Sequence, residues 1–161
     1  MVQAVSDQDF PEFLGSIRRF TDEKLIPVER QVEEEHAVPE EIVEEMRRLG
    51  LFGMTISQDY DGLGLSIEQQ CLATMEFTRA SCVYRARFST TLGLSSQAIL
   101  YNGTADQKRE WLPRMATGQV TASFALTEPE AGSDAGSLKT KAVPDGDGYV
   151  ISGQKCYITN A

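Results

Sequence analysis

The sequence predicts an α+β fold, in which an N-terminal all-α helical bundle domain is followed by the first strands of an incomplete antiparallel β domain. Three observations predict it. Helical patterns with capping signals run from the start to Gly118, short β-like runs follow, and those runs are too few to cover both faces of a sheet. We therefore expect a helical domain over residues 1–119 and the truncated start of a β domain over residues 120–161.

Composition and charge exclude several classes of protein. The chain has 161 residues, 41% of them hydrophobic and 24% charged, which is typical of a soluble globular protein. A formal net charge of −9 argues against binding nucleic acid through its phosphates. No run approaches the roughly 18 apolar residues that cross a membrane, and the first residues do not resemble a secretory signal. We expect a cytoplasmic protein that binds neither nucleic acid nor membrane.

The first expected helix is capped by Ser6, a residue type common at helix N-termini. Apolar residues then recur at helical spacing, and Pro27 should kink or end the helix. These apolar residues are Phe13, Ile17, Phe20 and Leu25. The acidic run 29–35 is better explained as a solvated helix face than as a binding patch.

A short core-facing helix is expected next, between Pro39 and Gly50. Proline suits the first turn of a helix and glycine suits the position after its end. The glycines and turn-forming residues of 51–65 then predict a structured loop.

Two capping boxes predict the starts of later helices, Ser66 with Gln69 and Thr104 with Gln107. One face of the first of these helices carries Ile67, Cys71, Met75 and Thr78. A helix rich in small residues ends at Gly103, between the two boxes. The pattern indicates about five helices in a bundle-like arrangement.

The three cysteines are Cys71, Cys82 and Cys156. They are odd in number and form no CxxC pair, as expected of reduced thiols inside a cell. We expect them to serve as small core hydrophobes.

The hydrophobic period changes after Gly118. Short β-like runs are found at residues 120–126, 138–143, 149–151 and 155–159. A turn over 145–148 joins the second run to the third. Three or four strands without further partners would leave an open sheet edge.

The most informative stretch is TEPEAGSD at residues 127–134, followed by KCYITN at residues 155–160. Within the first segment, Pro129 sets the chain direction and Gly132 permits close approach of the backbone. Thr127 and Ser133 offer hydroxyls, and backbone amides there could cradle a phosphate or a polar ring edge. Composition alone favours an ordinary turn, since glycine, serine and aspartate are the usual turn residues.

The order of these residues resembles the flavin-binding signature of the acyl-CoA dehydrogenase family. The resemblance extends to Val38-Pro39-Glu40, to Tyr60-Asp61-Gly62-Leu63-Gly64 and to the GT-xx-QK helix start at 103–108. It implies a helical domain, a middle β domain and a C-terminal helical bundle, of which this chain holds the first and the start of the second. It also implies FAD as cofactor, an acyl-CoA substrate, electron-transfer flavoprotein as acceptor, a role in fatty acid metabolism, and a homo-oligomer.

The same resemblance assigns roles around the flavin ring. Thr127 would hydrogen-bond the pyrimidine end of the flavin, and backbone groups near Phe124 and Leu126 would touch the ring edge. Such donors stabilise the charge of the reduced flavin.

Four further residues receive roles from the resemblance. Gly132 and Ser133 would lie near the cofactor phosphates or the pantetheine arm of the substrate. Tyr157 would stack on the isoalloxazine, and the Thr159 hydroxyl would approach the hydride-accepting nitrogen. On general grounds Tyr157 could instead be a core or interface aromatic, and Thr159 simply a strand residue.

Three positions depart from the family pattern. Asp61 stands where glycine is more frequent, so that the loop is rebuilt or its backbone needs no positive φ. Tyr157 often corresponds to tryptophan, and Ala161 to glycine.

No catalytic residue is predicted within the chain. The family base is a glutamate supplied from beyond the middle domain, and Glu128 belongs to the cofactor motif instead. His36 lies outside every motif, and no metal site is expected. We therefore expect an enzyme part that is inactive alone. The alternatives are a non-catalytic docking module that pairs with a separate C-terminal chain, and part of a related flavin-dependent acyl-CoA oxidase.

Overall fold

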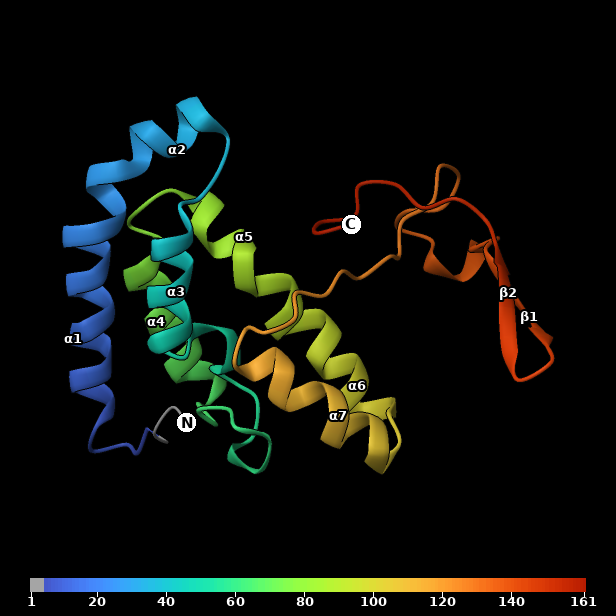
Figure 1. Cartoon of the computed structure of the whole chain (residues 1–161), viewed down its shortest axis with the longest axis horizontal. Helices are drawn as coiled ribbons and strands as arrows, with labels where there is room; N and C mark the ends of the chain where they lie inside the picture. Colours follow the sequence, from blue (N-terminus) through green and yellow to red (C-terminus); the bar gives the residue numbers. More distant parts are fainter. Residues whose placement is uncertain (1–4) are drawn as a thin grey trace. The chain divides into compact units, whose positions relative to one another are not determined.

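The computed structural model describes residues 5–161 and divides into two compact units. The helical unit ends at Ala122, and the hairpin unit comprises Ser123–Ala161. All the α-helices of the described chain lie in the helical unit, and both strands lie in the hairpin unit (Figure 1). This arrangement confirms the predicted fold class. None of the helices in the described part is long and apolar enough to span a bilayer.

The first helical stretch is interrupted instead of continuous. Helix α1 spans Phe10–Phe20, a π-helical turn covers Thr21–Leu25, a 3-10 turn covers Ile26–Val28, and α2 spans Glu29–Glu35. The Ser6 hydroxyl accepts a hydrogen bond from the Asp9 amide at 3.3 Å, so Ser6 organises the turn that precedes α1. Pro27 lies in the 3-10 turn, where the chain changes direction between α1 and α2 (Figure 1).

The remaining helices begin or end close to a predicted signal, except the helix at residues 82–90, for which no signal was predicted. They are α3 (Glu40–Arg48), α4 (Ile67–Phe77), α5 (Cys82–Thr90), α6 (Ser96–Asn102) and α7 (Ala105–Ala116). Both capping boxes form, with Ser66 and Thr104 each accepting from the amide three residues later. The predicted number of helices was too low, because a π-helical turn at Thr91–Ser95 and the turns after α1 divide longer patterns into shorter helices.

The segment between α3 and α4 is a buried, ordered loop. Two 3-10 turns, Leu51–Gly53 and Gln58–Tyr60, fold it back so that the Leu63 amide donates to the Gly53 carbonyl at 2.9 Å. Asp61 has φ of 61°. The backbone at this position therefore has a positive φ even though aspartate replaces the glycine that is more frequent in the family. Aspartate tolerates this conformation better than most residues.

Aromatic side chains from several elements meet in the core of the helical unit. The rings of Phe77 and Phe88 lie 5.3 Å apart, and Phe52 and Phe20 extend the cluster on either side. Tyr84 is fully buried, and its hydroxyl donates to the Leu25 carbonyl at 3.0 Å. A buried phenol needs such a partner, because an unpaired hydroxyl in the core is costly.

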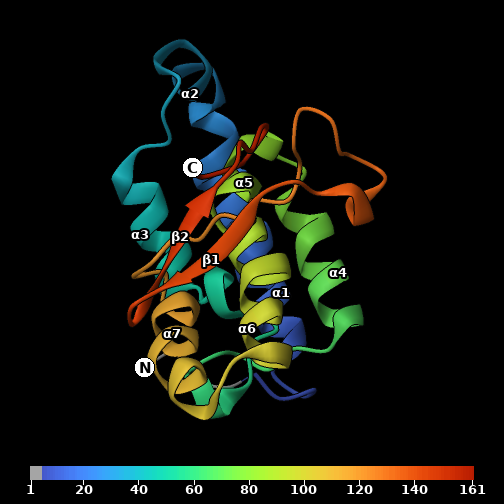
Figure 2. The same ribbon diagram turned by 90° about the vertical axis from the view of Figure 1, so that its right-hand side faces the viewer.

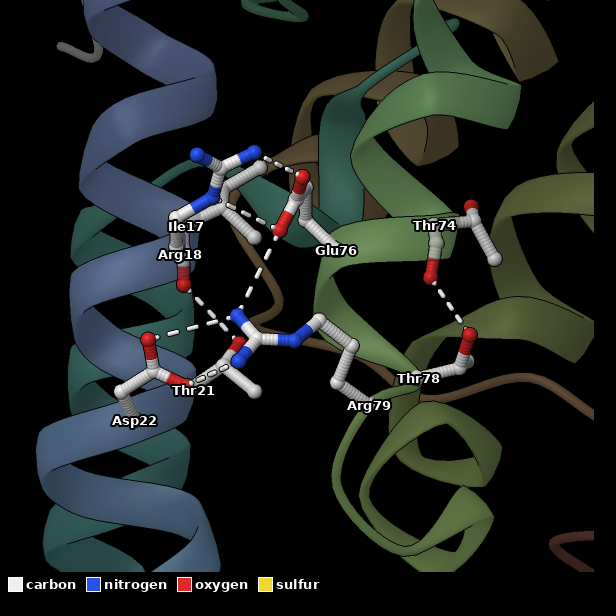
Figure 3. A network of polar contacts seen from close by, with 8 residues as sticks. All are labelled: Ile17, Arg18, Thr21, Asp22, Thr74, Glu76, Thr78 and Arg79. Carbon is white, nitrogen blue, oxygen red and sulfur yellow. Dashed lines mark hydrogen bonds and ion pairs between the residues drawn. The ribbon is translucent and has the colours of Figure 1, made fainter.

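An ion-pair network joins α1 and its π-helical extension to the end of α4 (Figure 3). Arg18 Nε donates to Glu76 Oε2 at 3.0 Å, and Arg79 bridges Glu76 and Asp22. These contacts lower the pKa of Glu76, first through the Arg18 hydrogen bond, and raise that of Arg18. The network fixes the position of α4 against α1.

The interpretation of the cysteines as core residues was wrong for two of the three. Cys71 and Cys82 are exposed, and Cys156 is half-buried. Cys71 belongs to the α4 face that also carries Ile67 and Met75, which are 70% and 68% exposed. Helix α4 packs through Ala73 and Phe77 instead. The period of a helix shows that residues share a face and not which face meets the core.

The hairpin unit contains two antiparallel strands, β1 (Lys141–Asp145) and β2 (Gly148–Ser152), seen in Figure 2. Their register pairs Lys141 with Ser152 and Asp145 with Gly148. The predicted strands at 120–126 and 155–159 were wrong, and the run 138–143 becomes a strand only from Lys141. Among the described residues, neither 120–126 nor 155–159 has a continuous hydrogen-bonded partner strand. Tyr157 also leaves the extended region, with φ of 59°.

Candidate functional site

Every residue predicted to touch the flavin lies in the hairpin unit. Phe124, Leu126 and Thr127 lie in an irregular segment before an isolated bridge between Glu128 and Ala131. Gly132 and Ser133 follow that bridge. Tyr157 and Thr159 lie in the segment after β2.

Direct hydrogen bonds join the first and last of these segments. The Cys156 amide donates to the Thr127 carbonyl at 3.0 Å. The Lys155 ammonium donates to the Leu126 carbonyl at 2.9 Å. We call this meeting of residues 126–128 with residues 155–157 the junction. It brings into contact two motifs that are separated by twenty residues of sequence.

Glu128 is the polar centre of the junction. Its side chain is 5% exposed, and its carboxylate accepts from the Lys139 amide at 2.6 Å, the Thr140 amide at 2.9 Å and the Lys155 ammonium at 2.9 Å. The Thr140 hydroxyl, the Lys139 amide and the Lys155 ammonium together lower the pKa of Glu128 to about 2. The Thr140 hydroxyl oxygen makes no hydrogen bond of ordinary geometry within residues 5–161. The hydrogen-bond donors to the Glu128 carboxylate are therefore the two amides and the Lys155 ammonium.

The carboxylate of Glu128 is therefore ionised and occupied by donors on both oxygens. A general base needs a pKa near the working pH and a free oxygen that faces the substrate. Glu128 meets neither requirement. This geometry supports the expectation that it is not the catalytic base.

Side chains at the positions predicted to contact the ring, through the Tyr157 side chain and through the backbone near Phe124 and Leu126, are open to solvent. Tyr157 is 93% exposed, and Phe124 and Leu126 are each more than a third exposed. Tyr157 has a left-handed backbone with φ of 59°, which is unusual for a bulky residue. Such outliers are found more often at functional sites than elsewhere.

The structure does not bring every predicted site residue to the junction. No hydrogen bond within the described residues links Gly132 or Ser133 to Tyr157 or Thr159. A Cβ added at Gly132 would meet no atom within 4 Å. The packing of the chain itself therefore does not explain glycine there, which leaves room for a ligand to approach the backbone.

Sequence reasoning missed the role of Glu128 and Lys155 in organising the site. They are separated by 27 residues and follow no shared period. The only sequence signal is a carboxylate and a lysine that each lie inside one of the two motifs. Nothing in the spacing predicts that they pair.

His36 lies apart from these motifs, at the left-handed end of α2. It lines a hollow of about 730 Å³ in the helical unit, together with Glu33, Arg79 and Ser81. No group of acidic, cysteine and histidine side chains suited to a metal occurs in the described part of the chain.

Comparison with known proteins decides the family. Residues 7–119 match the model for the acyl-CoA dehydrogenase N-terminal domain, and residues 123–161 match the model for the middle domain. The chain belongs to the acyl-CoA dehydrogenase family. The resemblance stated from the TEPEAGSD and KCYITN motifs is thereby confirmed.

Individual acyl-CoA dehydrogenases show the same relationship. The chain is 36% identical to (2S)-methylsuccinyl-CoA dehydrogenase of Cereibacter sphaeroides over 96% of its own length and 28% of that protein. It is 38% identical to the mitochondrial short-chain specific acyl-CoA dehydrogenase of Bos taurus, over 89% of its own length and 35% of that enzyme. A Mycobacterium smegmatis glutaryl-CoA dehydrogenase in complex with FADH2 superposes with a TM-score of 0.84 at 33% identity, over 95% of this chain and 39% of that one. The chain thus spans about a third of the length of these acyl-CoA dehydrogenases.

Proposed function

We propose that this chain supplies one wall of the FAD site of an acyl-CoA dehydrogenase. The observation that carries the proposal is the junction, in which the Cys156 amide binds the Thr127 carbonyl and so places the two cofactor motifs side by side. Family membership supports the cofactor, and the M. smegmatis relative is described with FADH2.

The proposed reaction is the α,β-dehydrogenation of an acyl-CoA thioester to a trans-2-enoyl-CoA. A carboxylate base takes the α-proton, and FAD, when bound, accepts the β-hydrogen as hydride. We propose electron-transfer flavoprotein as the acceptor of the electrons. The residues of this chain would bind and orient the cofactor and the substrate. None of them would act as the base, because Glu128 is unsuited to that role and no other residue matches the base motif of the family.

The hairpin unit offers the chemistry that such a site needs. The Thr127 hydroxyl and nearby backbone groups can hydrogen-bond the polar end of the ring, and exposed Tyr157 can stack on its face. Thr159 is exposed and the backbone at Gly132 is open, so in this proposal both would contact other parts of the cofactor, and Ser133 would contact cofactor or substrate.

We also propose that residues 1–161 alone bind FAD weakly and do not turn over, because the base has no counterpart among them. The three free thiols lead us to propose a reducing compartment such as the cytoplasm. Family membership leads us to propose a homo-oligomer and a role in fatty acid metabolism.

The test uses the complete gene product, including any residues that the gene encodes outside 1–161. We expect it to carry flavin absorbance, and that absorbance to bleach when a saturated acyl-CoA is added without oxygen. Loss of one hydrogen bond in Thr127→Ala should weaken FAD binding about tenfold. Thr121→Ala, an exposed threonine outside the motifs, is the matched control. A protein that neither carries nor takes up FAD would contradict the proposal.

A further inference from the structure

The hairpin unit has almost no apolar core to hold its segments together. Of the residues from Ser123 to Ala161, only Glu128 and Ala131 are buried. All ten residues of β1 and β2 are exposed. The unit is therefore organised mainly by polar contacts, in contrast to the aromatic core of the helical unit.

Glu128 contacts three separate stretches of that unit at once. Its own peptide bridges to Ala131, its carboxylate holds the amides of Lys139 and Thr140, and Lys155 joins it to the segment after β2. Lys155 also binds the Leu126 carbonyl, so the ammonium connects the carboxylate to the backbone beside Thr127. A buried carboxylate persists only with such a set of donors, since an unpaired buried charge is unstable.

We infer that Glu128 is a positioning residue for the flavin wall, and that with Lys155 it sets the distance between Thr127 and Tyr157. This inference rests on the proposed function. Glu128 would not touch the cofactor. It would act through the Leu126 and Thr127 backbone on one side and through Lys155 and Cys156 on the other.

The charges near Glu128 provide a matched control. Glu130 lies two residues away and pairs with the Lys139 ammonium, but its side chain is 68% exposed. It binds no amide of the junction in the described structure. Glu130→Gln therefore removes the same charge from the same loop without removing the contacts of Glu128.

The experiment compares Glu128→Gln, Lys155→Met, the double variant and Glu130→Gln in the protein as its gene encodes it. A glutamine at position 128 presents an NH₂ group to donors, so at least one contact is lost. We expect Glu128→Gln to weaken FAD binding tenfold or more and to slow flavin reduction at saturating acyl-CoA, with little change in KM. Glu130→Gln should stay within twofold of the native protein. The double variant should be less impaired than the two single effects predict, because neither charge is left unpaired.

Amide exchange of the flavin-free protein separates this inference from the proposed function. Loss of protection at Lys139, Thr140 and Cys156 in Glu128→Gln, but not in Glu130→Gln, supports the positioning role of Glu128. If protection is unchanged, or if protection is lost while FAD binding and flavin reduction stay native, the inference is overturned. If the native protein takes up no FAD at all, the proposed function fails, and the positioning role fails with it even where exchange shows that Glu128 protects these amides.

Discussion

At the scale of single residues, Gly62 shows how strictly the loop before α4 is packed. A Cβ built on it would lie 2.0 Å from the Ile56 carbonyl oxygen, and that atom is backbone, so it cannot move aside without disturbing the loop. The neighbouring Asp61 already occupies the left-handed region. Two adjacent positions therefore have demands that few residue types meet.

We expect Gly62→Ala to lower the free energy of unfolding by about 2 kcal/mol, because the added methyl overpacks the loop. The measurement is chemical denaturation of the native and variant proteins. Gly15→Ala is the control, since Gly15 lies inside α1 with nothing within 4 Å of its added Cβ. Alanine favours helices, so this change should raise the free energy of unfolding by about 0.5–1 kcal/mol. Equal effects of the two changes would contradict the packing account.

The ionisation of Glu128 predicts a pH dependence of the junction. Its folded pKa is lowered from 4.5 to about 2, so its contribution to stability is complete above pH 4.5 and is lost as the pH falls toward 2. Protection of the Cys156 amide, corrected for intrinsic exchange, should fall over this window. In Glu128→Gln the protection should be low already at neutral pH and should vary little. The charged groups around this carboxylate are Lys155 and the Lys139–Glu130 pair, and Glu130→Gln should keep the native profile.

Residue roles could be predicted from the sequence only where a local motif carries them. The capping residues Ser66 and Thr104 were predicted because a cap depends on residues three apart. The partners of Glu128 were not predicted, since a contact across 27 residues is decided by the fold. The roles of Thr127, Tyr157 and Thr159 toward flavin stay predictions.

At the scale of elements, the capping box that opens α4 makes a measurable contribution. Ser66 accepts from the Gln69 amide at 3.2 Å, and the Gln69 side chain accepts from the Ser66 amide at 2.9 Å. Figure 3 shows how the other end of this helix is held against α1 by Glu76 and Arg79. Polar groups thus satisfy the first turn of α4 and link its last turn to α1.

We expect Ser66→Ala to lower the free energy of unfolding by about 1 kcal/mol, because the first turn of α4 loses an acceptor. Ser66→Gly should lower the free energy of unfolding by only a few tenths of a kcal/mol, since glycine leaves the amide open to water. Thermal or urea denaturation of the helical unit measures both. If the two variants are equally destabilised, the loss does not come from the cap.

Element type was predicted well where periodicity and caps agree, as in α3, α4 and α7. It was wrong for residues 120–126 and 155–159, whose composition suits strands but which have no continuous partner in the described chain. A strand is defined by its neighbour as much as by its own sequence. The core-facing side of α4 also needed the fold, because Phe77 and not Met75 meets the aromatic cluster.

At the scale of the whole molecule, the motif order was a stronger guide than composition. TEPEAGSD resembles an ordinary turn in its residue types, and only its exact order together with KCYITN led to the acyl-CoA dehydrogenase family. The structure then adds the physical reason why these motifs belong together. They are joined by the Cys156 amide and the Lys155 ammonium at one junction.

The central claim is that this junction is one wall of a flavin site. Hydrogen exchange of the complete gene product with and without FAD tests it most directly, because exchange reports each segment separately. The account predicts that FAD slows exchange in residues 124–134 and 155–161 together, and leaves α1 to α3 unchanged. Protection of only one of these segments, or of neither, would contradict it.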